Sequence, residues 1–286
     1  MRLFFIFLLI YTSLFGFDYT LSKQVANGKT ALLRVEKEKG VTFEYVEFDK
    51  KNFPFLNTQD NTQRFALIPV SYYAKAGEKT LRVVYTKDGV THKKNLTFDV
   101  VYGEYKKERI QVSSKKVNPQ APKVKKRIAK EYAEAMRIYN TVDDTWYINK
   151  PFVMPLDSVI TSDFGKARVY NGSLKGYHSG TDFRAPVGTP IKASNDGKVV
   201  LVANRFYSGG TIIINHGKGL YTCYFHLSKF LVDEGDEVTE NQVIALSGKS
   251  GRVTGPHLHF AARINGVQVD PLQLITLINN TLTKVQ

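Results

Sequence analysis

The histidines of this chain are concentrated in its C-terminal half, in short motifs that also contain a carboxylate. Five of the six histidines follow residue 170. Ser-Gly-Thr separates His178 from Asp182, and one leucine separates His257 from His259. Catalytic zinc sites combine three imidazole or carboxylate ligands with an open position for water. The residues therefore predict a metal site made from His178, Asp182 and one histidine of the second motif.

Two further imidazoles are left for proton chemistry. The remaining histidine of the second motif and His226 are candidates for moving protons or stabilising a developing oxyanion. Each signal has a plainer interpretation when taken alone, since Asp182 could cap a turn and His226 could be a hydrogen-bonded core residue. Their joint occurrence in one glycine-rich region favours the metal site. His216 is interpreted as part of a turn, and Cys223, the only cysteine, can form neither an intrachain disulfide nor a thiolate site.

The elements around these motifs are predicted to be short strands. Gly180 and Thr181 disfavour a helix, so His178 and Asp182 are expected to converge from a tight turn that enters a strand. In a strand, residues i and i+2 share a face, so both imidazoles of His257–His259 point the same way. Glycine-rich turns separate the expected strands, which predicts a compact antiparallel β-domain over residues 149–286. The predicted strands are 190–193, 198–203, 211–216, 220–226, 243–247 and 257–264, and a terminal helix or turn is expected at 271–278.

Residues 18–112 are predicted to form a separate, small β-sandwich-like module. Apolar residues alternate with polar ones in several runs, a period that marks half-buried strands. Asp88-Gly89 between two of these runs indicates a hairpin, because both turn positions tolerate positive φ. The module contains one histidine, His92, which we expect to be solvated near the hairpin. We therefore interpret it as a positioning, binding or occluding module in a mainly β protein.

Residues 113–148 are predicted to be a basic linker followed by an amphipathic helix. Apolar residues at helical spacing place the helix at 122–139, with its apolar stripe packed on one of the two domains. The chain has a formal net charge of +14, and residues 106–130 contain ten Lys or Arg and one Glu. Such a segment attracts polyanions, so we expect loose attraction to anionic wall polymer or a membrane surface. Nucleic acid is disfavoured, because no aromatic platform interleaves the lysines.

The N-terminus indicates export. Arg2 precedes an apolar run that ends near Gly16, which is the pattern of a secretory signal peptide over residues 1–17. The run is short for a permanent membrane span, although an uncleaved anchor is the alternative. A protein with this leader is expected to be exported across a membrane.

Four motifs of the C-terminal region, in order and spacing, resemble the LytM-type (lysostaphin-like) zinc endopeptidases. The resemblance covers roughly residues 150–275 and implies one zinc ion held by His178, Asp182 and His259. It assigns catalytic roles to His257 and His226. The motifs are His178-Ser-Gly-Thr-Asp182 with the following Phe-Arg-Ala-Pro, Asp196-Gly197-Lys-Val, Tyr224-Phe-His226-Leu-Ser, and Thr254-Gly-Pro-His257-Leu-His259-Phe.

The resemblance also implies a substrate, a reaction and, together with the leader, a periplasmic and wall-associated location. The family cleaves peptide bonds in the stems or cross-links of peptidoglycan, with zinc-bound water as the nucleophile. We expect His257 to accept the proton of that water and His226 to stabilise the oxyanion, although the sequence leaves their exchange open. Arg168 matches a basic position that would touch substrate, and Ala261 replaces a glutamate of the family that is not a ligand. The expected groove walls are loops 162–177, 204–210 and 249–255.

Three rival interpretations remain. Some LytM-like proteins have lost zinc ligands and activate other wall hydrolases, and a non-catalytic wall-binding protein of this kind is the main alternative. Turn patterns such as Gly235-Asp-Glu-Val also occur in biotinyl and lipoyl carrier domains, but a carrier would leave the histidines unexplained. A binder of nucleic acid or acidic lipid, driven by residues 106–130, would show a steep salt dependence.

Overall fold

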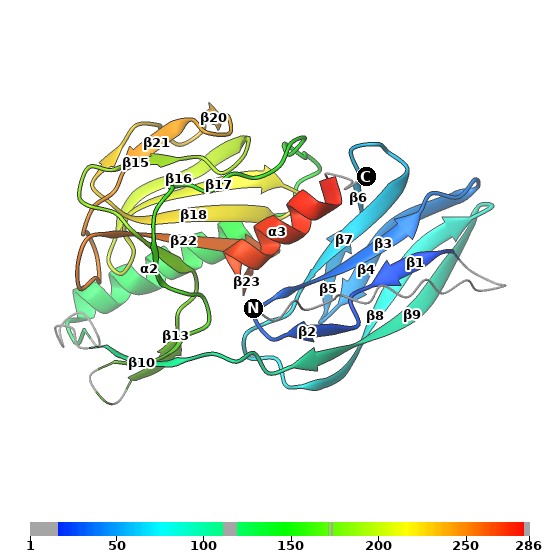
Figure 1. The fold of residues 1–286 in the computed structure, drawn as a ribbon, viewed down its shortest axis with the longest axis horizontal. Helices are drawn as coiled ribbons and strands as arrows, with labels where there is room; N and C mark the ends of the chain where they lie inside the picture. The colour runs from blue at the N-terminus through cyan, green and yellow to red at the C-terminus, as the bar shows by residue number, and fades with distance from the viewer. Residues whose placement is uncertain (1–16, 111–118, 171, 173, 283–286) are drawn as a thin grey trace. The chain divides into compact units, whose positions relative to one another are not determined.

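The computed structural model describes residues 17–110, 119–170, 172 and 174–282 (Figure 1). The predicted signal peptide lies almost entirely outside the described residues. Contacts divide the chain into two compact units. The first consists of the residues up to Tyr102 together with the end of the last helix, from Thr281. The second runs from Gly103 to Asn280. Among the described residues, no helix is both long enough and apolar enough to span a membrane.

The N-terminal unit is a β-sandwich, as predicted. One sheet has the strand order β1–β3–β7–β6 and the other β2–β9–β8–β4–β5, with antiparallel pairing except between β2 and β9. Buried aromatic side chains, among them Phe17, Phe53 and Phe65, fill its core. The strands are β1 (Tyr19–Leu21), β2 (Gln24–Ala26), β3 (Thr30–Glu36), β4 (Val41–Phe48), β5 (Lys51–Pro54), β6 (Leu56–Asn57), β7 (Gln63–Pro69), β8 (Gly77–Lys87) and β9 (Val90–Val101).

The predicted hairpin joins β8 to β9. Asp88 and Gly89 have φ angles of 49° and 81°, the positive values that a two-residue hairpin turn of this kind requires. His92 is exposed beside the turn, as expected, and its ring stacks on Tyr85 with centroids 5.4 Å apart. His92 is the only histidine among the described residues of this unit, so these residues offer no second imidazole for a metal or catalytic site.

The C-terminal unit is built on one large antiparallel sheet of order β11–β14–β22–β18–β17–β16–β20, with β23 paired to β22 (Figure 1). The predicted strands are confirmed, with ends that differ by a few residues. Strands β15, β21 and β19 form a separate small sheet, in the order β15–β21–β19. The elements are β11 (Ile160–Ser162), β14 (Thr181–Arg184), β15 (Pro190–Lys192), β16 (Gly197–Arg205), β17 (Gly209–Gly217), β18 (Leu220–Leu227), β19 (Lys229–Phe230), β20 (Glu237–Val238), β21 (Val243–Leu246), β22 (His257–Ile264), β23 (Val267–Val269) and the final helix α3 (Pro271–Leu282).

A third sheet of this unit was not predicted. Strand β10 (Lys107–Ile110) pairs in parallel with β12 (Ala167–Tyr170), which forms a hairpin with β13 (Leu174–Tyr177). The contacts of β10 place it in the C-terminal unit, and the division by contacts falls at Tyr102–Gly103, whereas the N-terminal module was predicted to extend to residue 112. The reason is long-range pairing: the partner of β10 lies far along the chain, beyond the helix.

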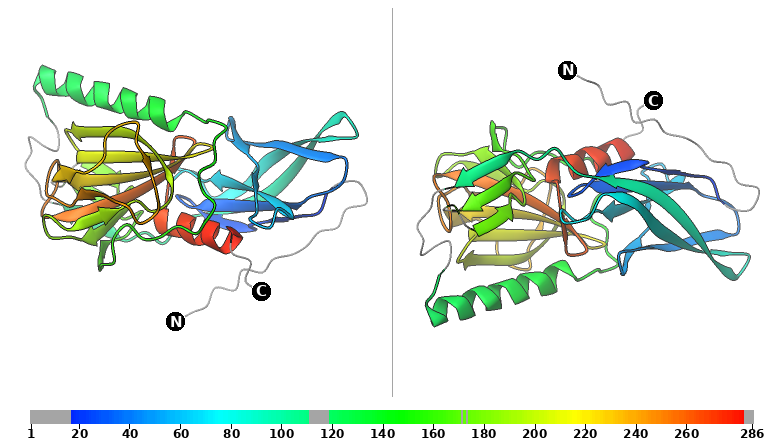
Figure 2. Two further views of the ribbon diagram at one scale, coloured as in Figure 1. Left: turned by 90° about the horizontal axis from the view of Figure 1, so that it is seen from above. Right: turned by 90° about the horizontal axis from the view of Figure 1, so that it is seen from below.

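Helix α2 spans Pro122–Tyr139, the predicted bounds, and lies along one face of the large sheet (Figure 2). Its C-terminal turns pack into the core through Tyr139, which joins Tyr221 and Cys223 among the buried residues. Tyr132, one of the apolar residues at helical spacing in α2, is 66% exposed. The apolar stripe is therefore buried mainly at the end of the helix.

Charged side chains fix the middle of α2 to the turn between β16 and β17. Arg205 contacts the Glu134 carboxylate at 2.9 Å and also donates to the carbonyl of Glu131. The Glu131 carboxylate accepts a hydrogen bond from the amide of Phe206 at 2.9 Å, and Arg127 donates to the carbonyl of Asn204 at 2.9 Å. Part of the basic segment is thus used to hold the helix in place.

His216 lies in β17 and is fully buried, so its interpretation as a turn residue was wrong. Its Nδ1 donates to the carbonyl oxygen of Asp196 at 2.7 Å, and its Nε2 accepts from the hydroxyl of Thr222 at 2.8 Å. Burial lowers the pKa of His216 to about 4, against a small opposing effect of Asp196. Its exclusion from the catalytic set is consistent with this purely internal role.

The buried state of His216 predicts a pH-dependent stability. The unfolded chain protonates this residue below about pH 6.5 whereas the folded chain resists it until about pH 4, so the free energy of unfolding falls as the pH decreases through that window. At pH 5 this residue should lower the free energy of unfolding of the wild type by about 2 kcal/mol relative to neutral pH. Urea unfolding at pH 7.5 and pH 5 should show a smaller pH effect in His216→Gln. Equal pH effects in both proteins would contradict this, and the other histidines cancel in the comparison.

Candidate active site

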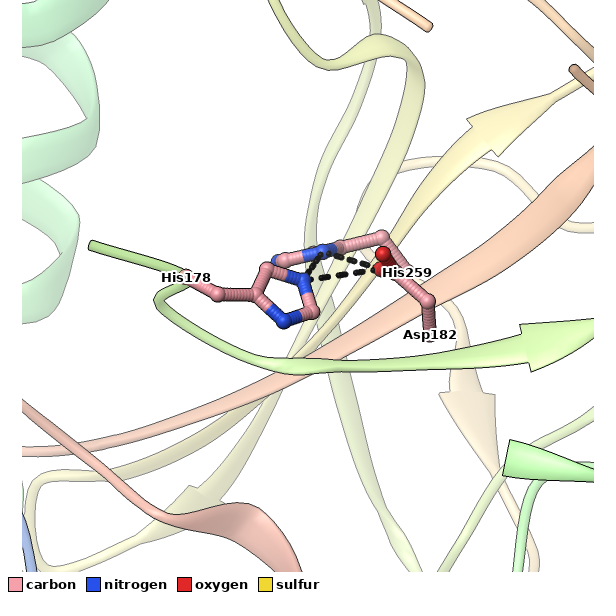
Figure 3. A group of neighbouring side chains, drawn as sticks. All are labelled: His178, Asp182 and His259. Carbon is pink, nitrogen blue, oxygen red and sulfur yellow. Dashed lines mark hydrogen bonds and ion pairs between the residues drawn. The ribbon is translucent and has the colours of Figure 1, made fainter. Parts of the chain in front are cut away.

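His178, Asp182 and His259 converge on one point in the C-terminal unit (Figure 3). Asp182 lies in β14 and His259 in β22, directly opposite each other in the antiparallel register, while His178 lies in the loop that enters β14. Nε2 of His178 is 2.9 Å from Oδ1 of Asp182 and 3.0 Å from Nδ1 of His259. The distance from Nδ1 of His259 to Oδ1 of Asp182 is 2.8 Å, and all three residues are buried.

This donor set fits a divalent cation. The Nδ1 of His178 donates to the carbonyl of Asp163 at 2.8 Å, so in the neutral ring Nε2 carries a lone pair directed at the other two ligand atoms. An ionised carboxylate and a lone pair that face each other need a positive charge between them.

The size of the cluster agrees with such an ion. Donors bound tetrahedrally at zinc distances are about 3.3 Å apart, so an outward shift of a few tenths of an ångström would accommodate the metal. Burial lowers the pKa of His259 to about 4, which keeps this ring in the neutral form that binds metal. The ring also stacks on Phe225 at a centroid distance of 5.3 Å, which fixes its plane.

His226 and His257 lie beside the cluster, with ring centroids 4.8 Å apart. Nδ1 of His226 donates to the carbonyl of Ser250 and Nδ1 of His257 to the carbonyl of Gly255, each at 2.9 Å. These bonds leave Nε2 of each neutral ring as the proton acceptor, and Nε2 of His257 is 3.7 Å from Oδ1 of Asp182. The structure thus brings together all five histidine and aspartate residues that the sequence singled out.

The backbone of His226 is unusual. Its φ angle is +64°, in the left-handed region that a histidine rarely adopts, and such strain often occurs at functional positions. Burial, followed by the nearby His259 and His257, lowers the pKa of His226 to about 3. This ring is therefore neutral over the physiological range unless a nearby negative charge develops.

Arg168 lies in the site, but its guanidinium contacts protein groups. Nη2 is 3.3 Å from Oδ2 of Asp182 and donates to the hydroxyl of Ser162 at the same distance. Nε donates to the carboxylate of Glu108 at 3.0 Å. Arg168 also lines the cavity described below, and its role in substrate binding stays a prediction. Within the protein, it contacts the candidate metal ligand Asp182 directly.

A cavity of about 410 Å³ opens over the cluster and is lined mainly by polar groups. Two of the expected walls contribute to it, through Ser162 and Arg168 and through the segment 252–256. The third expected wall, loop 204–210, does not line it. Glu108 and Arg109 of β10 form a wall that the sequence did not reveal.

Loop 204–210 instead supports the loop that carries Arg252. The amide of Arg252 donates to the carbonyl of Tyr207 at 2.8 Å, and its guanidinium lies 4.4 Å from the centre of the Tyr207 ring. Gly251 packs so closely on Gly209 that a Cβ there would overlap the backbone. No local motif could have indicated this role, because strands β17 to β21 separate the two loops in the chain.

Cys223 takes no part in the site. It is buried against α2, where its Sγ lies 3.3 Å from the hydroxyl of Tyr139. Burial raises the pKa of the Cys223 thiol to about 11, so the thiolate is not formed at neutral pH.

Two imidazoles and a carboxylate around one point, with two more imidazoles beside them, are the donor and proton-transfer set of a mononuclear metal-dependent hydrolase. Comparison with known families specifies the class. Residues 176–271 match the sequence model of Peptidase family M23, and the chain carries a domain of this family. The predicted resemblance to LytM-type peptidases is thus confirmed at the level of the family.

Individual relatives agree with this assignment. Peptidoglycan DD-endopeptidase ShyA of Vibrio cholerae is 43% identical over 122 residues, which are 42% of this chain and 28% of ShyA. DD-carboxypeptidase/endopeptidase Mpg of Neisseria meningitidis is 44% identical over 97 residues, 34% of this chain and 22% of Mpg. The chain thus spans about a quarter of the length of these curated relatives.

The fold has a solved counterpart over both units. A crystal structure of a peptidase M23 from Pseudomonas aeruginosa superposes with a TM-score of 0.69 at 27% sequence identity. The superposition covers 87% of this chain and 94% of the other. The combination of an N-terminal β-module with an M23 domain therefore also occurs in another protein.

The close packing at Gly180 yields a test of the site. A Cβ at Gly180 would overlap the carbonyl oxygen of Phe260 and the ring of His259, so Gly180→Ala must displace this ligand. We expect the variant to bind zinc at least about tenfold more weakly than the wild type, measured by competition with a chelator. Gly255→Ala is the matched control, because the space around Gly255 is open. Equal zinc affinity of Gly180→Ala and wild type would refute the placement of His259.

Proposed function

We propose that this protein is an exported zinc-dependent peptidoglycan hydrolase that cleaves amide bonds in stem peptides or cross-links. The observation that carries the proposal is the convergence of His178, Asp182 and His259 with His226 and His257 beside them. The names of the related DD-endopeptidases support peptidoglycan as the substrate. Among the possible bonds, we propose the cross-link cleaved by DD-endopeptidases.

The chain's own residues support a division of labour. When bound, a zinc ion would supply Lewis acidity that polarises the scissile carbonyl and makes a water molecule acidic near neutral pH. His257 would accept the proton of the attacking water at Nε2, since its Nδ1 is held by the Gly255 carbonyl. His226 would donate to the developing oxyanion once protonated, because its Nδ1 is held in the same manner by Ser250.

The geometry of the cavity suits a polymer substrate. Its lining is polar and its mouth is open, so an extended peptide can enter and leave from the side. Arg109 and Arg252 both line this cavity and give it positive charge, and stem peptides carry carboxylates. Wall-associated action in the periplasm is part of the proposal, and the signal-like N-terminus favours it.

The non-catalytic alternative has less support. A LytM-like protein that only activates other hydrolases can lose its zinc ligands, whereas this chain retains all three ligand candidates and both catalytic candidates. Loose attraction of residues 106–130 to anionic wall polymer or a membrane surface stays part of the proposal. No nucleic-acid partner is proposed.

Digestion of purified sacculi tests the function directly. We expect the wild type to release soluble fragments, the release to stop with a zinc chelator, and zinc to restore it. Mass spectrometry of the fragments identifies the bond that is cut. A zinc-loaded wild-type protein that releases nothing would contradict the enzyme and favour the regulatory alternative.

Two histidine variants separate binding from turnover. His259→Ala should lose bound zinc and activity together, because it removes a ligand. His257→Ala should retain zinc while kcat falls about 100- to 10,000-fold, the contribution expected from a positioned base. Metal analysis of the purified variants and rates on sacculi give both quantities. Wild-type digestion by His259→Ala would show that the ligand assignment is wrong.

A further inference from the structure

The most basic segment of the chain contains one acidic residue, and that residue reaches the active site. Residues 106–130 hold ten Lys or Arg and a single Glu, Glu108. Strand β10 pairs in parallel with β12 in a register that places Glu108 level with Arg168. The Glu108 carboxylate and Nε of Arg168 are 3.0 Å apart. This ion pair therefore joins a segment outside the M23 domain to a residue beside the metal ligands.

Arg168 in turn contacts the carboxylate of Asp182. Oδ1 of Asp182 faces His178 and His259, whereas Oδ2 lies 3.3 Å from Nη2 of Arg168. The two oxygens of this carboxylate thus have separate partners, and the arginine fixes the rotation of the carboxylate plane. The Arg168 and Asp182 side chains are only 15% and 10% exposed, so water weakens their interaction little.

The charges explain why a glutamate is needed. A guanidinium beside the ligand cluster repels a second cation and competes for the electron density of Asp182. Glu108 offsets that charge and, through the planar geometry of arginine, holds Nη2 in its position on Oδ2. Loss of the Glu108 charge would therefore both loosen the carboxylate and leave an unbalanced positive charge near the metal.

We propose that Glu108 is a positioning residue of the zinc site, which acts through Arg168 to orient the ligand Asp182. The inference rests on the proposed zinc binding and extends the site beyond residues 176–271. It also gives Arg168 its main role in holding Asp182 rather than substrate. Outer partners of metal ligands typically contribute 10- to 100-fold in metal affinity.

The test measures zinc affinity of the full-length protein by competition with a chromophoric chelator. Glu108→Gln keeps the shape of the side chain and removes its charge, and we expect it to bind zinc about 10- to 100-fold more weakly than the wild type. Glu104→Gln is the matched control, since it makes the same chemical change at an exposed position shortly before this segment. This control should bind zinc as the wild type does.

A double-mutant cycle distinguishes positioning from a general structural effect. If Glu108 acts through Arg168, Glu108→Gln should have no further effect on zinc affinity in an Arg168→Gln background. An equal loss in both backgrounds would overturn the proposal, because it would mean that the substitution acts through the fold. Circular dichroism melting of each variant checks that the fold is retained.

The outcomes separate this inference from the proposed function. Wild-type zinc affinity in Glu108→Gln would overturn the inference and leave the hydrolase proposal intact. Tight zinc binding by the wild type without digestion of sacculi would overturn the hydrolase, and the weakened binding of Glu108→Gln would still support the inference. A wild type that binds no zinc would overturn both.

Discussion

The site depends on the mutual repulsion of groups that the sheet forces together. Antiparallel pairing of β14 and β22 places Asp182 opposite His259, and the entering loop adds His178 at hydrogen-bond distance from both. The ionised carboxylate and the lone pair of His178 are buried, so water cannot separate their charges. The strands' hydrogen bonds, the surrounding packing and contacts such as those of Arg168 with Asp182 and of the Asp163 carbonyl with His178 keep these groups in place. A cation turns this unfavourable arrangement into a favourable one, which couples metal binding to the fold.

Backbone carbonyls also shape the site, because they orient the imidazole rings. His178, His226 and His257 each donate Nδ1 to a main-chain oxygen, which leaves Nε2 of each neutral ring as the reactive nitrogen. The carbonyl that holds His226 belongs to Ser250, whose hydroxyl in turn donates to the carbonyl of Leu227 at 2.8 Å. Loops therefore fix the orientation of the imidazoles, while strands fix their positions. This explains why loop 204–210 acts as a support rather than a wall.

Sequence patterns predicted the features that depend on neighbouring residues. The hairpin at Asp88-Gly89, the helix at 122–139 and the shared face of His257 and His259 all follow from local geometry. Strand β10 was not predicted, since four residues with one apolar side chain carry little signal and their partner lies beyond the helix. The partners of Arg168 were missed for the same reason, because only the folded pairing reveals that Glu108 lies beside it.

The basic segment shows how composition alone can mislead about charge. Its net charge suggests an exposed polycation, yet both flanks bind the C-terminal unit through specific contacts. Glu108 on the first flank pairs with Arg168, and Arg127 on the second donates to Asn204 and pairs with Glu131. A segment held at both ends by its own domain has less freedom to follow an external polymer than a free tail has. The proposed attraction to anionic wall polymer would therefore act on a segment whose first flank, Glu108 and Arg109, lines the cavity.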